Sequence, residues 1–436
     1  MRAATPRKQS ASCATGRSDR DEPPRGGGTR AQVAVVIVAF PVLAAVGCQN
    51  TTPRSSGTVC CDQKGAPTFI ASKADDDDGD GNPRDEDFPR INDEDDDIAD
   101  HAWVVDASGV YHLFFHNEGL GRPNEIEHYT SADLQTFDYV GVALRPEPSG
   151  WDAGGLWAPS IIEHQGRYYM FYTGIDDGGG EVKQRIGLAT STDLAAWTRQ
   201  PVNNCPGTTG DGCVYECAEN WTTWGGPDGS FNHQCRDPFV IRDPVSGRFV
   251  LLATAKSTNQ FGVITVAYST DLQDWNGAGF VDATRRLATG VGAQTTGGQS
   301  ENPHVVSYED TYYLLFCDWN DPEDFNTAEN PRTITQYATS PSLTADSLGS
   351  KQWTYRGYIP DPGVNAIEIL RTSEGIWLMS QSVSNERSGN HPDHRRELRI
   401  KCLTWRGGFT FATSNVRLPC RASTVKIGPL AAEPLP

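Results

Sequence analysis

The sequence predicts an all-β protein, a five-bladed β-propeller with antiparallel four-stranded blades, and an internal repeat is the main reason. One phrase, Ser-x-Asp-Leu followed after two further residues by Phe or Trp, occurs three times, beginning at Ser131, Ser191 and Ser269. The 44 Gly and 28 Pro residues, with only 3 Met, favour short strands and tight turns over long helices. Repetition of this kind indicates a stack of similar units.

Each unit opens with a short motif and continues through a turn into an apolar or aromatic strand. The five openings are Asp100-His101-Ala102-Trp103, Trp157-Ala158-Pro159-Ser160, Arg236-Asp237-Pro238-Phe239, Glu301-Asn302-Pro303-His304 and Asn365-Ala366-Ile367-Glu368. The strands that follow begin at Tyr111, Tyr168, Phe249, Tyr312 and Ile376, and their continuous apolar runs are typical of strands buried on both faces. Such units cannot bury their faces alone, so we expect them to stack around an axis; their unequal spacing argues against a solenoid.

Three segments flank or precede the propeller, which we expect over residues 98–425. Residues 1–48 predict an export leader, because an uncharged run at 31–46 follows a segment that carries Arg and Lys. This run is shorter than a membrane span of about 20 residues, although a transmembrane anchor is the alternative. Cys48 resembles the acylated Cys of a bacterial lipoprotein, so we expect a secreted protein or a cell-surface lipoprotein. Residues 49–97 predict an acidic disordered linker, and 426–436 a C-terminal tail.

The charge of the chain limits its partners. The formal net charge of −19 disfavours nucleic acids and anionic membrane surfaces, and it suits a neutral substrate such as a carbohydrate. We expect a monomer that requires no cofactor and has no metal site in the propeller. The acidic run from Asp75 to Asp80 could bind Ca²⁺ through carboxylate and carbonyl oxygens, although the absence of a Glu that closes the loop favours a solvated spacer.

Four cysteines lie in one Gly-rich insert, namely Cys205, Cys213, Cys217 and Cys235. In an exported protein they predict two disulfides that pin a loop at the rim of the funnel. Their spacing lacks the paired C-x2-C units of structural zinc sites. Cys317 lies in an apolar strand pattern and predicts a buried free thiol.

Three acids at the unit openings are the candidate catalytic residues: Asp100, Asp237 and Glu301. Asp100 and Asp237 are each followed by another Asp six residues later, so we expect Asp100 and Asp237 at equivalent positions of their units. Glu301 is expected one residue before the equivalent position of its own unit. Cleavage of a glycosidic bond needs one carboxylic acid and one carboxylate, which a pocket of convergent acids supplies. The simpler alternatives are that Asp100 is the last acid of the linker and that Asp237 only forms an Asp-Pro turn.

At these positions the sequence resembles the superfamily of five-bladed propellers formed by glycoside hydrolase families 32, 43 and 68, over residues 100–418. Asp100 precedes Tyr111 by eleven residues, as the family 32 nucleophile precedes its Tyr-His-Leu-Phe strand. The matches to motifs are Arg236-Asp237-Pro238 with the Arg-Asp-Pro of family 32, Glu301-Asn302-Pro303 with its Glu-Cys-Pro, and Trp157-Ala158-Pro159 with the Trp-Ala-Pro of family 43.

The family 32 signature Asn-Asp-Pro-Asn-Gly is absent around Asp100, and too few residues follow Cys420 for that family's C-terminal β-sandwich. The resemblance is therefore strongest to family 43, and it implies hydrolysis of arabinofuranosides or xylosides from plant or microbial oligo- and polysaccharides. It implies that Asp100 is the general base (in family 32, the nucleophile), that Asp237 stabilises the transition state or modulates the pKa of the acid, and that Glu301 is the general acid.

Inversion is the expected stereochemical outcome, with the carboxyls of Asp100 and Glu301 ~6.5–9.5 Å apart. We expect burial and the charge of Asp237 to raise the pKa of Glu301, while Asp100 stays ionised. Two alternatives remain, a retaining family 32-like β-fructosidase and a propeller that binds glycans without cutting them. A sialidase is disfavoured because Leu replaces Gly in the repeated phrase.

Five further residues are candidates for substrate binding. Trp103, Trp157 and Trp319 could stack on a sugar ring, Arg236 could contact the substrate, and His304 could donate a hydrogen bond to it or hold an axial ion through water. The alternative for each aromatic residue and for His304 is a place in the core between blades.

Overall fold

The computed structural model describes residues 98–414, except 118–123, 135, 177–182, 218–221, 223–233, 259–261, 282–298, 320–333, 344–352, 359–363, 373–376, 385–395 and 407–409. All described residues belong to Ser55–Pro436, one of the two compact units of the chain. The predicted leader with Cys48, the linker with its acidic run and the C-terminal tail lie outside the described residues. Within the described part, no helix is long and apolar enough to cross a membrane.

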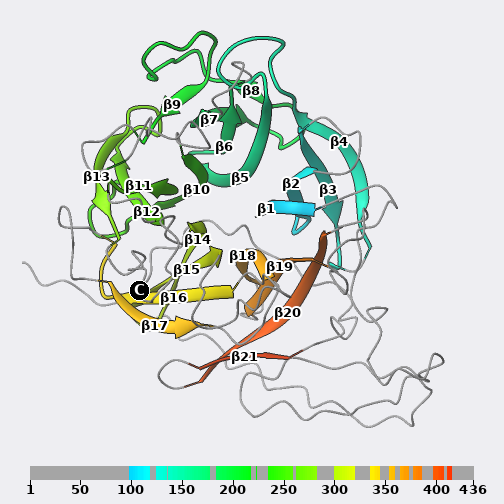
Figure 1. Cartoon of the computed structure of the whole chain (residues 1–436). Helices are drawn as coiled ribbons and strands as arrows, with labels where there is room; N and C mark the ends of the chain where they lie inside the picture. The colour runs from blue at the N-terminus through cyan, green and yellow to red at the C-terminus, as the bar shows by residue number, and fades with distance from the viewer. Residues whose placement is uncertain are drawn as a thin grey trace, which may run out of the picture. The chain divides into compact units, whose positions relative to one another are not determined.

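The described elements are β-strands that form five antiparallel sheets, each following the chain order (Figure 1). The first sheet contains β1 (Ile98–Val105), β2 (Tyr111–Asn117), β3 (Ile126–Ser131) and β4 (Asp138–Leu144). The second contains β5 (Gly155–His164), β6 (Arg167–Ile175), β7 (Gln184–Ser191), β8 (Thr198–Arg199) and β9 (Cys213–Tyr215). The third contains β10 (Cys235–Arg242), β11 (Phe249–Lys256), β12 (Gly262–Ser269) and β13 (Asn276–Phe280).

The last two sheets follow the same order. The fourth contains β14 (Gln299–Tyr308), β15 (Thr311–Trp319), β16 (Ile334–Ser340) and β17 (Thr354–Tyr358). The fifth contains β18 (Val364–Arg371), β19 (Trp377–Ser384), β20 (Arg396–Arg406) and β21 (Thr410–Ser414). The predicted all-β propeller with antiparallel four-stranded blades is confirmed, with one correction: the second sheet has an additional strand, because the insert returns and pairs β9 with β7.

Neighbouring sheets share hydrophobic cores, which explains why their strands are apolar on both faces. Phe171 of the second sheet packs in one cluster with Leu251 of the third, and Leu113 of the first packs in another with Leu378 of the fifth. Comparable clusters join the other neighbouring pairs. Burial of apolar area at ~25 cal/mol per Å² therefore stabilises the contacts between sheets as well as each sheet. In Figure 1 the first strands, β1, β5, β10, β14 and β18, surround a common centre.

The repeated Ser-x-Asp-Leu phrase forms the turn after the third strand of a sheet. The Ser Oγ accepts a hydrogen bond from the backbone N–H of Leu134, Leu194 and Leu272 at 2.8, 2.9 and 2.9 Å. Each of these Leu residues has a positive φ and is buried. The hydroxyl bond and the buried side chain together stabilise an otherwise unfavourable backbone conformation, so the phrase is a structural turn.

Contacts between β1 and β19 join the first sheet to the fifth. Ser380 Oγ lies 2.7 Å from His101 Nε2 and accepts a hydrogen bond from Trp103 Nε1 at 2.9 Å. Ser382 Oγ donates to the backbone oxygen of Ile98 at 2.5 Å. Burial lowers the pKa of His101 to about 3, so its imidazole is neutral in this contact.

Candidate active site

The first strand of each sheet has an irregular register near the centre of the molecule. The shifts lie between Ile98 and His101, Trp157 and Ser160, Arg236 and Phe239, Glu301 and His304, and Asn365 and Ile367. Four residues at these shifts have positive φ, namely Ala158 (43°), Asp237 (54°), Asn302 (51°) and Ala366 (43°). A β-bulge redirects side chains from the pleated pattern, which here turns the opening motifs toward the axis.

These bulges line a cavity of about 280 Å³ that is open to solvent. All five first strands contribute to its wall, through Asp100, His101, Ala158, Pro159, Asp237, Pro238, Asn302, Pro303, Ala366, Ile367 and Glu368. The cavity thus receives two of the three predicted catalytic acids. The third, Glu301, directly precedes the lining residue Asn302 and is connected to the site through Arg236.

Asp237 is a buried carboxylate with several donors. Thr254 Oγ1 donates to Asp237 Oδ2 at 2.8 Å, and the backbone N–H of Asn302 donates to the same oxygen at 3.3 Å. Arg236 Nε lies 3.5 Å from this oxygen, while the backbone N–H of Asp237 donates to Thr173 Oγ1 at 2.9 Å. These contacts fix the orientation of the Asp237 carboxyl group.

Asp100 is partly exposed to the cavity, with 20% of its side chain accessible. Asn302 Nδ2 donates to Asp100 Oδ1 at 2.5 Å, and His116 Nδ1 lies 3.8 Å from Asp100 Oδ2. A carboxylate that is held by donors but open to solvent is suited to receive a proton from water.

The expected equivalence of Asp100 and Asp237 needs a correction of one residue. Asp100 is the second of two residues between the paired positions Ile98 and His101, whereas Asp237 is the first between Arg236 and Phe239. The cause lies in the pairing: the bulge of β1 lies opposite a point on β2 that is one residue farther from the start of that strand than the corresponding point on β11, opposite the bulge of β10. The two carboxyls therefore reach one cavity from different positions of their bulges.

Glu301 and Arg236 form an ion pair between the third and fourth sheets, in which Arg236 Nη2 donates to Glu301 Oε1. Arg236 also donates from Nη1 to Gln184 Oε1 at 3.2 Å. Its guanidinium therefore connects the second sheet with both Asp237 and Glu301. Because Arg236 is buried and paired with two acids, it acts as a fixed cation within the site.

The pKa of Glu301 is raised to about 7, as predicted. The largest cause is burial, which disfavours the charged carboxylate; Arg236 opposes the rise, and the charges of Asp237 and then Asp100 add to it. Burial and the charge of Asp237 were expected from the sequence, whereas the opposing effect of Arg236 was not. A carboxyl with a pKa near neutrality can donate a proton at the pH at which its neighbours are ionised.

Two of the residues predicted to bind substrate lie in the core instead. Trp103 is only 6% exposed, packs against Tyr111 and donates a hydrogen bond to Ser380. His304 is buried, accepts a hydrogen bond from the backbone N–H of Ile369 at 3.1 Å and lies 3.5 Å from Glu368 Oε1 through Nδ1. Both positions correct the substrate-contact prediction, because each side chain joins neighbouring sheets.

Trp157 lies directly before the lining residue Ala158, is partly exposed, and has its ring centroid 6.2 Å from that of His116. Within the described part of the chain, its Nε1 has no hydrogen-bond partner. The side chain of Trp319 lies outside the described residues. Among the described side chains, no group of three or more His, Cys, Asp or Glu residues is placed to hold a metal ion.

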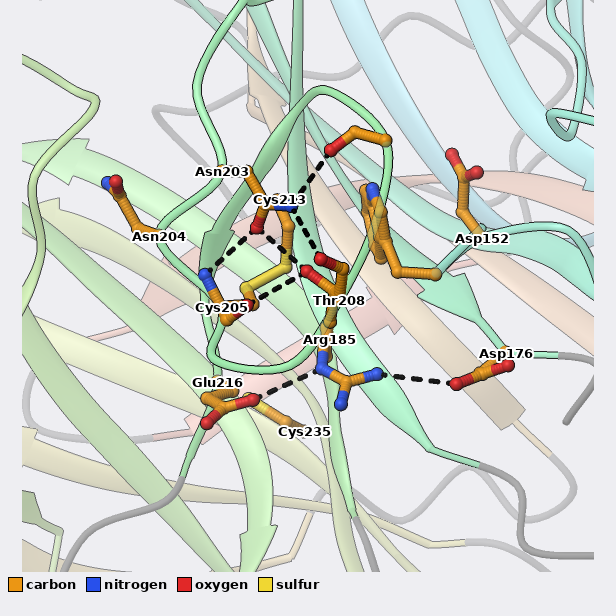
Figure 2. The surroundings of a disulfide bond; sticks show 12 residues. Asp152, Asp176, Arg185, Asn203, Asn204, Cys205, Thr208, Cys213, Glu216 and Cys235 are labelled. Carbon is orange, nitrogen blue, oxygen red and sulfur yellow. Dashed lines mark hydrogen bonds and ion pairs between the residues drawn. A yellow bond between two sulfur atoms is a disulfide. The ribbon is translucent and has the colours of Figure 1, made fainter. Parts of the chain in front are cut away.

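Two disulfides order the described part of the insert, as predicted: Cys205–Cys213 and Cys217–Cys235. Figure 2 shows the first beside Asn203 and Thr208, whose hydroxyl donates to the Cys205 backbone oxygen at 2.8 Å. The loop between Cys217 and Cys235 lies almost entirely outside the described residues, so its predicted place at the rim stays a prediction. Cys317 is a buried thiol outside both disulfides.

Sequence reasoning did not identify Asn302 or Glu368 as site residues, although both line the cavity. The sequence feature that could have identified Asn302 is its position directly after Glu301, where the Glu-Cys-Pro motif has Cys. Taken together, two carboxyl groups that line the cavity, those of Asp100 and Asp237, and the adjoining carboxyl of Glu301, whose pKa is near neutrality, supply groups for acid–base chemistry.

The chain is similar to known proteins over most of its described part. The family described as Glycosyl hydrolases family 43 matches residues 96–410. A sucrose-6-phosphate hydrolase of Klebsiella pneumoniae is 26% identical over 227 residues, which cover 50% of this chain and 42% of the relative. A probable sucrose-6-phosphate hydrolase of Psychromonas ingrahamii is 31% identical over 186 residues, covering 41% and 29%. The chain thus spans less than half the length of these curated relatives.

Solved structures show the same fold. The sucrose-6-phosphate hydrolase of Lactobacillus gasseri superposes with a TM-score of 0.55 at 19% identity, covering 73% of this chain and 61% of that one. The endo-arabinase of Bacteroides thetaiotaomicron superposes with a TM-score of 0.53 at 16% identity, covering 72% and 96%. At these identities the likeness concerns the fold alone.

Proposed function

Because the chain belongs to glycosyl hydrolases family 43, we propose that it is a glycosidase. Its proposed substrates are plant- or microbe-derived oligo- and polysaccharides of the arabinofuranoside or xyloside type. The observation that carries the proposal is the buried carboxyl of Glu301, whose pKa of about 7 suits an acid at neutral pH. The cavity is open to solvent and is lined by carboxyl groups from three different first strands, those of Asp100, Asp237 and Glu368.

In the proposed reaction Asp100 accepts a proton from water, and the water oxygen attacks the anomeric carbon. The bond to the leaving oxygen breaks as Glu301 donates its proton to that oxygen. Arg236 bonds Glu301 through Oε1, which leaves Oε2 to carry the proton. Asp237 raises the pKa of Glu301 through its charge and is itself fixed by Thr254. Because water attacks from the face opposite the leaving group, the product anomer is inverted.

Two further assignments belong to this proposal. The five sheets are the five blades of one propeller, which is supported by the cores that successive sheets share and by the contacts between β1 and β18. The protein works outside the cytoplasm, as a secreted enzyme or as a lipoprotein anchored at Cys48. The two disulfides support export, because such bonds persist in oxidising compartments.

The proposal is tested by hydrolysis of a panel of aryl arabinofuranosides, xylosides and galactosides, together with sucrose. We expect turnover of at least one aryl glycoside by the wild type. Asp100→Asn and Glu301→Gln each remove a proton-transfer group and lower kcat by ~10²–10⁴-fold. Glu301→Gln recovers most of its rate on 2,4-dinitrophenyl glycosides, whose leaving group needs no proton, whereas Asp100→Asn stays slow on them.

Asp193→Asn is the matched control, since this exposed carboxylate accepts backbone hydrogen bonds in a repeated turn far from the acids in sequence. It should keep wild-type kcat. A wild type that binds oligosaccharides but cleaves no member of the panel would instead be a glycan-binding propeller. Equal losses for Asp193→Asn and Asp100→Asn would contradict the assigned roles.

A retaining β-fructosidase is the second candidate, because the named activity of both sequence relatives is that of sucrose-6-phosphate hydrolases. Proton NMR of the first-formed product separates the two. Inversion gives the anomer opposite to the substrate, whereas retention, a covalent glycosyl ester on Asp100 and rapid cleavage of sucrose would assign the chain to the fructosidase mechanism.

A further inference from the structure

Asn302 contacts two of the three acids. Its side-chain Nδ2 donates to Asp100 Oδ1 at 2.5 Å, and its backbone N–H donates to Asp237 Oδ2 at 3.3 Å. It also directly follows Glu301 in the chain. Asn302 thus contacts the proposed base through its side chain and the proposed modulator through its backbone N–H, and it is bonded in the chain to the proposed acid.

We propose that Asn302 is a positioning residue that holds Asp100 as an ionised, correctly oriented base, an inference that rests on the proposed function. An amide N–H can only donate, so its bond to Asp100 requires an accepting carboxylate oxygen. The bond to Oδ1 fixes the orientation of the Asp100 carboxyl group. Because a hydrogen bond to the charged form of an acid favours that form, the amide also disfavours early protonation of Asp100.

The backbone of the bulge does not itself require Asn at this position. Ala158 and Ala366 occupy corresponding bulge positions of the second and fifth sheets with φ of 43°, against 51° for Asn302. Alanine is therefore compatible with this conformation in the same fold. What Asn302 adds is its amide group, and that group contacts Asp100.

Several charged or titratable groups act on Asp100 besides Asn302. His116 on β2 lies 3.8 Å away, and Arg236 on β10, Glu301 on β14 and Cys317 on β15 interact with its charge. Asp237 on β10, Glu368 on β18 and His101 beside it line the same cavity. The Asn302 amide donates a hydrogen bond to Asp100 without adding a charge to this group of neighbours.

The experiment compares Asn302→Ala with Asn302→Asp on the aryl glycoside that the wild type cleaves best. We expect Asn302→Ala to lower kcat by ~10- to 100-fold with KM changed less than about threefold, because a misplaced base costs rate and not binding. We also expect the acid limb of its kcat/KM profile to move up by ~0.5–1 pH unit.

Asn302→Asp has nearly the same shape but places a second carboxylate against Asp100. If the amide acts as a donor, Asn302→Asp is slower at pH 7 than Asn302→Ala; if Asn302 only fills space, Asn302→Asp keeps wild-type rate. The control is Asn203→Ala, which removes an amide that bonds backbone oxygens in the insert and leaves the pH profile unchanged.

The possible results distinguish the proposed role of Asn302 from the proposed glycosidase function. An active wild type with an unshifted acid limb in Asn302→Ala, or a fully active Asn302→Asp, overturns the role of Asn302 and leaves the glycosidase assignment standing. A wild type without turnover on the whole panel overturns both. Thermal melting of each variant confirms that the compared proteins are folded.

Discussion

The second and fourth sheets have similar backbones near the axis and differ in what they carry there. In both β5 and β14 the register shifts across two residues, and Ala158 and Asn302 have positive φ at the same point. The second sheet places Trp157 before this point, and the fourth places Glu301 there. The bulge is therefore a property of the fold, whereas the chemistry depends on single side chains at fixed backbone positions.

The third sheet has a different side chain at the same point, because Arg236 occupies the position that Trp157 and Glu301 occupy in the second and fourth sheets. After the substitutions of Asp100 and Glu301, we expect Arg236→Met to have the largest effect, lowering kcat/KM by ~10²–10³-fold, because it leaves Asp237 and Glu301 without their buried cation. Arg236 holds the pKa of Glu301 down, so the basic limb of the pH profile should also move above about 7.

Arg242→Met is the matched control, because Arg242 lies on the same strand, is exposed and bonds only a turn oxygen among its described hydrogen bonds. Its pH profile should equal that of the wild type. A basic limb that stays in place in Arg236→Met would show that Arg236 does not tune Glu301.

The next largest expected effect is a pH dependence of the free energy of unfolding. The pKa of Glu301 in the folded protein, about 7, lies above the ordinary value of 4.5. Between these values the folded state binds more protons than the unfolded state, so the free energy of unfolding decreases as the pH rises from 4.5 to 7. At 1.36 kcal/mol per unit the loss amounts to about 2–3 kcal/mol. Urea unfolding at pH 4.5, 6 and 8 measures it.

Glu301→Gln removes this titration while its carbonyl can still accept from Arg236, so its stability should be nearly constant across the window and exceed that of the wild type at pH 8. Glu163→Gln on β5 is the control from the second sheet, where the carboxylate accepts a hydrogen bond from the Gly166 backbone. Parallel curves for the wild type and Glu301→Gln would exclude Glu301 as the source of the pH dependence.

The smallest expected effect belongs to the second sheet. Trp157→Phe keeps an aromatic ring but removes Nε1 and part of the ring area, so we expect KM to rise ~2- to 5-fold with kcat within about twofold, equivalent to ~0.5–1 kcal/mol of stacking. A loss as large as that of Arg236→Met would show that the second bulge also takes part in the chemistry.

Much of the fold could be predicted because its signals are local. The repeated Ser-x-Asp-Leu turn is stabilised by hydrogen bonds between residues close in the sequence, and the aromatic strands recur along the chain as continuous apolar runs. The strand β9 could not be predicted, because its three residues pair with β7 only through the folded insert. A short strand that depends on tertiary contacts leaves little local pattern.

The sequence was sufficient to predict which acids contribute to the site, but it was not sufficient to predict their exact register or contacts. The three acids stood in aligned motifs, but the register of Asp100 differs by one residue because the bulge position in β1 is set by its pairing with β2. The contact between Asn302 and Asp100 spans 202 residues and has no local signal. Trp103 and His304 were assigned to substrate because an aromatic or imidazole ring suits a sugar site and a core equally well.

The bonds between β1 and β19 have a consequence for the synthesis of the protein. Asp100 lies on a strand held by Ser380 and Ser382, and the bonds from these residues to β1 span 279 and 284 positions. At ~5–20 residues per second a ribosome needs roughly 15–60 s to make the intervening chain. During that time the first sheet has no partner on one side. A nascent chain therefore carries Asp100 long before it can fix its orientation, and activity should first appear only after the fifth sheet has left the ribosome.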